Sequence, residues 1–235
     1  MAPPADLVDL PELASVGGFF ALRAERPGPP GTHLPLARIH AGDHAPLTAR
    51  VDKVTARLDA PESRIGVSVA HLGLAARLWS LALGSAALYG RVLDLDPERL
   101  CWDWDGASPD DLWLDGVRTR PVAELADAVV RDHLDPLHTA LRSTYRISER
   151  LLWGNAGSAL AGAARELHGW AGRHGRPEAG EHALALAAEL LRHPALTGTG
   201  TLTGTAFRRR SCCLYYRCPG GGLCGDCCFD RPPGR

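Results

Sequence analysis

Six of the seven cysteines of this 235-residue chain lie between positions 212 and 228. Four of them, Cys212, Cys213, Cys224 and Cys227, follow the pattern Cys-Cys-x10-Cys-x2-Cys. A Cys-x2-Cys turn lets two thiolates converge on one metal centre, and the Pro-Gly-Gly-Gly stretch at 219–222 can turn the chain back towards the adjacent pair. The spacing therefore predicts one centre enclosed by four thiolates.

The residues alone leave the kind of centre open. Side chains of neighbouring residues in an extended chain point apart, so Cys212 and Cys213 suit a single tetrahedral zinc poorly, whereas a two-iron cluster is larger. The spacing is also neither of the common ferredoxin patterns. Disulfides are disfavoured because the N-terminus lacks the basic start and apolar core of a secretory signal, which predicts a cytoplasmic protein with reduced thiols.

Composition excludes some partners. Hydrophobic residues make up 45% of the chain, charged residues 23%, and the formal net charge is -1. This balance does not suggest a nucleic-acid partner. The longest apolar region, residues 67–89, is interrupted by His71 and Arg77, so we expect a buried helix and no stable membrane insertion.

Apolar spacing predicts a mainly α-helical fold that positions the cysteines. Apolar residues between 47 and 58 recur at steps of three and four, as on one face of a helix. Helices are expected to begin near Pro61, Pro121, Pro136, Ser148 and Pro177, because proline and serine favour first turns and caps. Alternating apolar residues in 100–114 predict one small β-hairpin.

A run of threonine and glycine at 197–205 predicts a break in the chain before the cysteines. We therefore expect a helical domain over residues 1–205 and a cysteine-ligated module over residues 206–235. Within the helix that begins near Ser148, Asn155 and Ser158 share a face with small neighbours at 154 and 157. Such a face could approach a ligand closely, but small residues more commonly let two helices pack tightly, which is our expectation.

The cysteine segment resembles a known family. "RRSCCLYYR" at 209–217 and "GGGLCGDC" at 220–227 look like the C-terminal [2Fe-2S] signature of the FhuF-like ferric-siderophore reductases, and "RLWS" at 77–80 and "LLWGNAGSAL" at 151–160 resemble that family's helical domain. The resemblance implies a [2Fe-2S] cluster held by Cys212, Cys213, Cys224 and Cys227. It also implies one-electron reduction of the Fe(III) of an imported siderophore, with release of Fe(II) in the cytoplasm.

Two further cysteines depart from the family's pattern. Cys218 stands where the family usually has an aliphatic residue, and Cys228 directly follows the last expected ligand. Either could replace a neighbouring ligand, but the spacing is satisfied without them, so we interpret both as bystanders.

Arginines flank the thiolates, and Arg209, Arg210 and Arg217 are our candidate substrate-binding residues. Their positive charge would attract anionic ferric chelates and raise the potential of the cluster. Equally, they could tie the module to the helical domain. We expect no catalytic acid or nucleophile, because electron transfer requires only proximity, together with an electron donor that the sequence does not identify.

Two other functions remain open at this point. The same thiolates could stabilise a binding protein around zinc, or they could belong to an electron-transfer protein that has no siderophore site of its own.

Overall fold

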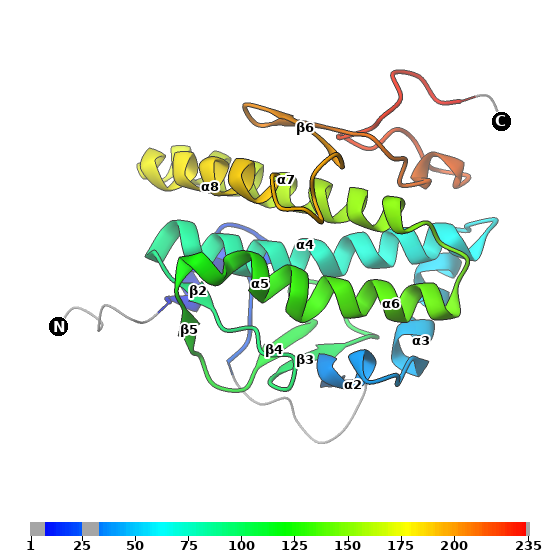
Figure 1. Cartoon of the computed structure of the whole chain (residues 1–235), viewed down its shortest axis with the longest axis horizontal. Coiled ribbons are helices and arrows are strands. Elements are labelled where there is room, and N and C mark those ends of the chain that lie inside the picture. The colour runs from blue at the N-terminus through cyan, green and yellow to red at the C-terminus, as the bar shows by residue number, and fades with distance from the viewer. Residues whose placement is uncertain (1–7, 25–32, 234–235) are drawn as a thin grey trace.

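The computed structural model describes residues 8–24 and 33–233 and is built mainly from helices, as expected (Figure 1). Two long helices, α4 (Ser63–Tyr89) and α7 (Glu149–Arg173), pack against each other at its centre. The other helices are α1 (Leu10–Ser15), α2 (Leu36–His40), α3 (Ala45–Arg57), α5 (Leu125–Val129), α6 (Asp135–Thr144) and α8 (Pro177–Leu190). Short turns join them: η1 (Gly18–Phe20), η2 (Val122–Glu124), the π-helical η3 (Val130–Leu134) and η4 (Tyr215–Arg217).

Helix α4 forms the core of the protein. Its residues Leu78, Trp79 and Leu81 are completely buried, and it contacts α3, α7 and α8. By length and composition alone α4 could cross a membrane, since its most apolar stretch has a mean hydropathy of 1.4, but 72% of that stretch is buried inside the protein. The apolar run is therefore explained by packing within the fold.

Most helix starts lie near the predicted residues. Ser148 is the N-cap of α7, α8 begins at Pro177, and Pro136 is the second residue of α6. Pro61 is different, because α4 begins only at Ser63. Glu62 has extended backbone angles and is the N-cap, so the proline lies outside the first turn.

Three small sheets lie around the helices. The expected hairpin is confirmed as β3 (Leu100–Asp103) paired antiparallel with β4 (Leu112–Leu114). A third strand, β1 (His33–Pro35), pairs with the other edge of β3. No local pattern predicted β1, nor the short pair β2 (Val92–Leu93) and β5 (Thr119–Arg120).

The threonine-glycine run does not form the expected break. Its residues include β6 (Gly200–Thr203), which pairs antiparallel with β7 (Ala206–Arg209), so the strand depends on its partner and not on its own composition. Gly200 is required for this pairing, because a Cβ atom there would overlap the ring of Phe207. The boundary between residues 205 and 206 falls in the turn of this hairpin and stays a prediction.

Arg77 is a charged residue in the middle of the core. Its guanidinium binds Asp111 through Nε at 2.9 Å, and it donates to the carbonyl oxygens of Gly18 at 2.9 Å and Phe19 at 2.6 Å. Arg77 and Asp111 are 1% and 4% exposed. Burial lowers the pKa of Arg77, and the Asp111 carboxylate opposes this shift. The arginine therefore fixes η1 against α4.

We expect Arg77→Met to lower the free energy of unfolding by about 3–5 kcal/mol, because it leaves the Asp111 carboxylate buried without its partner. Urea denaturation followed by circular dichroism measures the change. Arg131→Met is the control, since Arg131 forms exposed ion pairs with Asp127 and Asp132 and its loss should leave the midpoint almost unchanged. Equal shifts in the two variants would contradict a special role for Arg77.

Candidate metal centre

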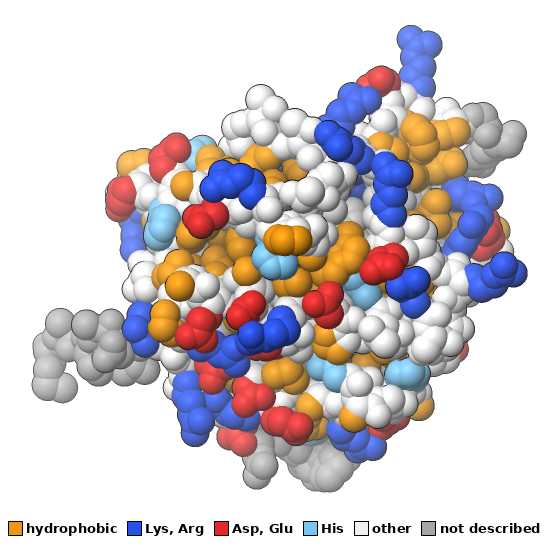
Figure 2. All heavy atoms as spheres, in the orientation of Figure 1, with side chains coloured by type: hydrophobic (Ala, Val, Ile, Leu, Met, Phe, Trp, Pro, Cys, Tyr) orange, Lys and Arg blue, Asp and Glu red, His pale blue; other side chains and the backbone are white. Residues whose placement is uncertain are grey.

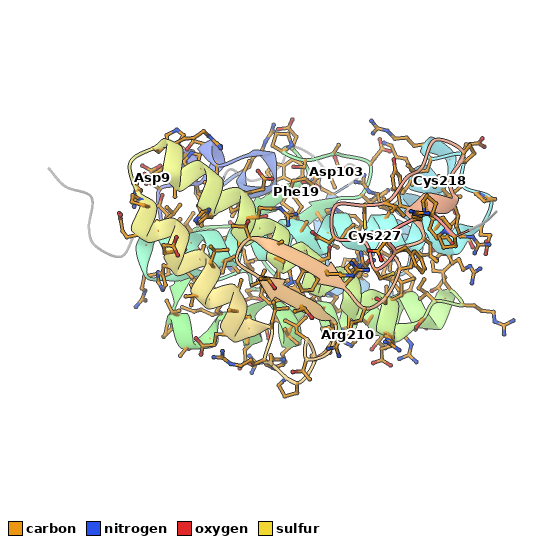
Figure 3. All side chains as sticks on the ribbon, turned by 90° about the horizontal axis from the view of Figure 1, so that it is seen from above. Asp9, Phe19, Asp103, Arg210, Cys218 and Cys227 are labelled. Carbon is orange, nitrogen blue, oxygen red and sulfur yellow. The ribbon has the colours of Figure 1, made fainter. Side chains whose placement is uncertain are left out.

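The four predicted ligands lie in the segment that follows β7, on top of α4 and α7 (Figure 3). Cys213 is buried, whereas Cys212, Cys224 and Cys227 are half-buried. The thiol of Cys213 accepts hydrogen bonds from those of Cys212 and Cys224. These bonds lower the pKa of Cys213 and raise the pKa values of its two partners. The Cys213 thiol thus interacts with its neighbour Cys212 and with Cys224 from the distant pair.

Backbone amides point at the ligand sulfurs. The N–H of Leu214 donates to Cys212 Sγ at 3.2 Å, and the N–H of Phe229 donates to Cys227 Sγ at 3.4 Å. Leu214 has a φ of 69°, in the left-handed region that few non-glycine residues adopt. Amide donors to sulfur stabilise the thiolate form and are one of the means by which proteins adjust iron–sulfur potentials. The local backbone therefore suits anionic sulfur ligands.

Arg209 places a buried positive charge beside the thiols. Its side chain is 2% exposed and donates from Nη2 to Asn155 Oδ1, while Nε and Nη1 have no hydrogen-bond partner among the described residues. Its charge also favours the thiolate forms of Cys213 and Cys224. Buried donors without partners are costly, and a buried cation needs a nearby anion. A negatively charged group held by these cysteines meets that need.

Polar contacts fix the cysteine segment to the two long helices. From α4, Ser68 Oγ donates to the carbonyl oxygen of Cys213 at 2.8 Å, and Asn155 of α7 donates to the carbonyl oxygen of Ser68 at 2.8 Å. Ser158 Oγ donates to Asp226 Oδ2 at 2.6 Å, and Arg165 pairs with the other oxygen of Asp226 at 3.1 Å. The thiols are therefore held at defined positions relative to the helical domain.

The small face of α7 has a partner besides the expected helix. A Cβ atom at Gly154 would overlap Ser211, and one at Gly157 would overlap Thr199, so both glycines allow the cysteine segment and the β6–β7 hairpin to approach α7. Asn155 on the same face donates to Ser68 of α4, so the expected packing between helices is present there, and the two glycines admit a second partner that we did not expect. Pattern alone could not show it, because the partner is an irregular segment more than 40 residues away in the chain.

A groove of about 590 Å³ opens beside the thiols. Its walls come from η1, α4, α7 and the cysteine segment, and Cys224, Gly225 and Asp226 lie at its edge. Sequence reasoning missed the residues of η1 and the pair of Arg165 with Asp226. No spacing rule connects them, since they come from three separate parts of the chain.

The models of two known families match the chain. Residues 74–210 match the family described as "Ferric iron reductase FhuF-like transporter", and residues 209–229 match "FhuF 2Fe-2S C-terminal domain". The chain belongs to the FhuF-like family. No curated protein matches the chain. The cysteine segment of this FhuF-like protein is thus a [2Fe-2S]-binding module, as the resemblance predicted. We call residues 209–229 the FhuF module.

The donor set fits such a cluster better than a single metal ion. The adjacent thiols of Cys212 and Cys213 suit a two-iron cluster better than one tetrahedral ion, and Cys213 interacts with Cys224 of the second pair. Which four of the six cysteines bind stays a prediction of the FhuF pattern.

The two extra cysteines lie next to the expected ligands. Cys218 is buried, and burial raises the pKa of its thiol, with the charge of Cys213 acting in the same direction. Burial likewise raises the pKa of Cys228, and Cys227 adds to the effect. The pKa values of the predicted ligands Cys212 and Cys224 are raised as well, so the interpretation of Cys218 and Cys228 as bystanders stays a prediction from the spacing.

The structure separates the three arginines proposed to bind substrate. Only Arg209 borders the groove, and it is buried. Arg210 is exposed and borders a different hollow of about 280 Å³ with Arg150 and Ser211. Arg217 pairs with Glu62 at 2.7 Å and so links the FhuF module to the start of α4.

Proposed function

We propose that this FhuF-like protein is a cytoplasmic ferric-siderophore reductase. It passes one electron from a [2Fe-2S] cluster, held by Cys212, Cys213, Cys224 and Cys227, to the Fe(III) of a siderophore, and it releases Fe(II). One observation carries the proposal: three of the four thiols are half-buried and not enclosed. A bulky chelate can thus approach the centre directly, and electron transfer does not require it to enter the core.

When bound, the cluster supplies electrons one at a time. The protein's own residues hold it and adjust its charge. Arg209 offsets the negative charge that reduction adds, and the Leu214 and Phe229 amides do so at individual sulfurs. Asp226, bound by Ser158 and Arg165, keeps the Cys224–Cys227 turn against α7.

The substrate needs no acid or nucleophile from the protein. Fe(III) prefers hard oxygen donors, and Fe(II) binds them less strongly, so reduction itself loosens the chelate. Each cycle oxidises an external one-electron donor once and reduces one Fe(III) to Fe(II). No bond of the siderophore needs to break.

The proposal predicts that a trap for Fe(II) accelerates net reduction. All-thiolate [2Fe-2S] clusters commonly have potentials of about -400 mV, and tightly chelated Fe(III) can be comparably hard to reduce, so removal of Fe(II) pulls the reaction forward. Anaerobic stopped-flow absorbance of the dithionite-reduced protein, mixed with ferric hydroxamates, catecholates and carboxylates, measures reoxidation with and without the trap.

Two outcomes of this experiment would contradict the proposal. A cluster that stays reduced before every chelate, yet passes its electron to a generic carrier protein, would indicate an electron-transfer protein without a siderophore site. A colourless protein that retains zinc after anaerobic purification would indicate a zinc-stabilised binding protein.

A further inference from the structure

We infer that a one-electron carrier protein with an acidic surface docks at the hollow beside Ser211 and reduces the cluster there. We call this site the donor hollow, and it is the cavity of about 280 Å³ whose lining includes Arg150, Arg210 and Ser211. The step oxidises the carrier by one electron and reduces the cluster by one, and no bond forms or breaks. The inference rests on the proposed function for the direction of electron flow, and it adds the site and the charge class of the donor.

The position of the donor hollow is the first argument. Ser211 lines it and is the chain neighbour of Cys212, a predicted cluster ligand. Cα atoms of neighbouring residues lie about 3.8 Å apart, so a protein seated on the hollow comes close to the cluster. The described residues that line the hollow all differ from those that line the groove beside Cys224. A docked carrier therefore need not cover that groove.

Two arginines without acidic partners converge on the hollow. Arg150 lies in the first turn of α7, Arg210 directly follows β7, and both side chains are exposed. Neither forms an ion pair with another described residue, and the adjacent Glu149 pairs with Arg142 at 2.7 Å. Among the residues that the structure describes, no Asp or Glu lines the hollow. The hollow thus presents two unpaired positive charges to an incoming carboxylate.

The place of Arg150 in its helix is unfavourable without a ligand. The N-terminus of a helix carries partial positive charge, so acidic residues stabilise the first turn and cations destabilise it. Arg150 is the second residue of α7, and no carboxylate of the described chain offsets the cost. A carboxylate of a bound partner would offset it, which points to an anionic occupant.

The hollow is preformed and has the composition of a protein interface. The N–H of Arg210 donates to the carbonyl oxygen of Thr199 at 2.8 Å, and Ser211 Oγ donates to the carbonyl oxygen of Arg150 at 3.2 Å. The half-buried Trp153 forms part of the lining. Arginine and tryptophan are enriched at interfaces, and a preformed site lowers the entropic cost of binding. The site therefore suits a protein partner.

The wider surface around the hollow is also positive. Residues 206–233 contain five arginines and two aspartates, although the whole chain has a formal net charge of -1. Figure 2 shows Lys and Arg side chains gathered over this C-terminal segment. Opposite charges steer two proteins together and raise the rate of association, so this surface favours an acidic carrier over a basic one.

Binding tests the hollow without turnover. We expect the holoprotein to bind two acidic carriers at low salt, an oxidised plant-type [2Fe-2S] ferredoxin and an oxidised flavodoxin, and to bind both less tightly as salt rises. Arg150→Glu and Arg210→Glu should each raise the Kd at least fivefold in isothermal titration calorimetry. Glutamate favours the first turn of a helix, so Arg150→Glu does not endanger folding, and an unchanged cluster absorption spectrum checks both variants.

Arg173→Glu is the matched control. Arg173 is exposed, is the last residue of α7 and forms no ion pair with another described residue. It follows Arg150 by 23 residues, which corresponds to about 35 Å along a helix. The variant changes the net charge by the same amount far from the hollow, so its Kd should stay within twofold of the wild-type value.

The rate of cluster reduction tests the direction of electron flow. In anaerobic stopped-flow absorbance at low salt, the double variant Arg150→Glu, Arg210→Glu should accept an electron from reduced ferredoxin at least tenfold more slowly than the wild type. Reduced methyl viologen is a small cation, so its rate of electron delivery should not fall in the same variant. The wild-type rate with ferredoxin should decrease as salt increases.

The outcomes separate this inference from the proposed function. Unchanged Kd values and rates in the reversed variants, or no binding of either carrier to the wild type at low salt, would overturn the donor hollow and leave the reductase function intact. Slower reduction of a trianionic ferric tris-catecholate by the viologen-reduced variants, with normal carrier binding, would assign the hollow to the substrate instead. A protein that accepts electrons from ferredoxin through the hollow and reduces no ferric chelate would support the inference and overturn the proposed function.

Discussion

Cys213→Ser is expected to abolish the visible absorption and the EPR signal of the reduced cluster. Cys213 is the most buried of the four predicted ligands, and it accepts hydrogen bonds from the thiols of both Cys212 and Cys224. A serine hydroxyl at this position ionises far less readily than the thiol and is a poor ligand for iron in an all-thiolate site. Loss of this sulfur should therefore remove the whole centre. Anaerobic purification followed by absorption and EPR spectroscopy measures the result.

Two other cysteines provide the controls. Cys101 lies on β3, outside the FhuF module, so Cys101→Ser should leave the spectrum unchanged. Cys218→Ser decides the ligand set, because Cys218 is the other buried cysteine of the module. Bleaching in Cys218→Ser together with a normal spectrum in Cys213→Ser would show that our assignment is wrong.

Arg209→Leu is expected to lower the reduction potential of the cluster. The guanidinium has two donor nitrogens that no described residue uses, and it lies next to the thiols. A hydrogen bond to a charged group contributes about 1.5–3 kcal/mol. Since a tenfold change in the equilibrium constant of a one-electron couple corresponds to roughly 59 mV, loss of one such bond in the reduced state should lower the potential by roughly 60 mV or more. Anaerobic redox titration followed by absorbance measures it.

The neighbouring residue offers a matched control for Arg209. Arg210 carries the same charge one position later, but it is exposed, and water screens its field. Arg210→Leu should therefore leave the potential nearly unchanged, while Arg209→Lys should recover part of the loss because it retains the charge without the planar set of donors. A larger shift in Arg210→Leu than in Arg209→Leu would disprove the role assigned to the buried guanidinium.

Local patterns in the sequence were sufficient to predict most of the helices and to recognise the cysteine segment as a cluster-binding signature. Three elements illustrate this, and all three are present: the apolar stripe of α3, the start of α7 after Ser148 and the alternation in β3. Each is a property of a few neighbouring residues. The FhuF signature is likewise local, because the ligand spacing falls within 16 residues of chain from Cys212 to Cys227.

Features that depend on distant contacts could not be predicted. The arginines at 209, 210 and 217 look equivalent in the sequence, yet one is buried against Asn155, one is exposed and one pairs with Glu62. The path of the chain from β7 across α7 and α4 determines the environment of each arginine. The groove beside Cys224 depends on the same kind of information. One of its walls is η1 from the N-terminal part of the chain, which the hydrogen bonds of Arg77 hold in place.

Lys and Arg side chains gather over the C-terminal segment in Figure 2, at the upper right of that view. The contiguous core cluster runs from Val8 to Leu196 and excludes the buried residues Phe207, Cys213 and Cys218. The cysteine segment meets this core through Leu214 and through hydrogen bonds and ion pairs.

This separation has a consequence for how the protein matures in the cell. We expect a chain that has not yet received iron and sulfide to hold the core between Val8 and Leu196 folded, with the cysteine segment left to close around the cluster. We expect the supply of clusters, and not the folding of the polypeptide, to set how quickly the active protein accumulates.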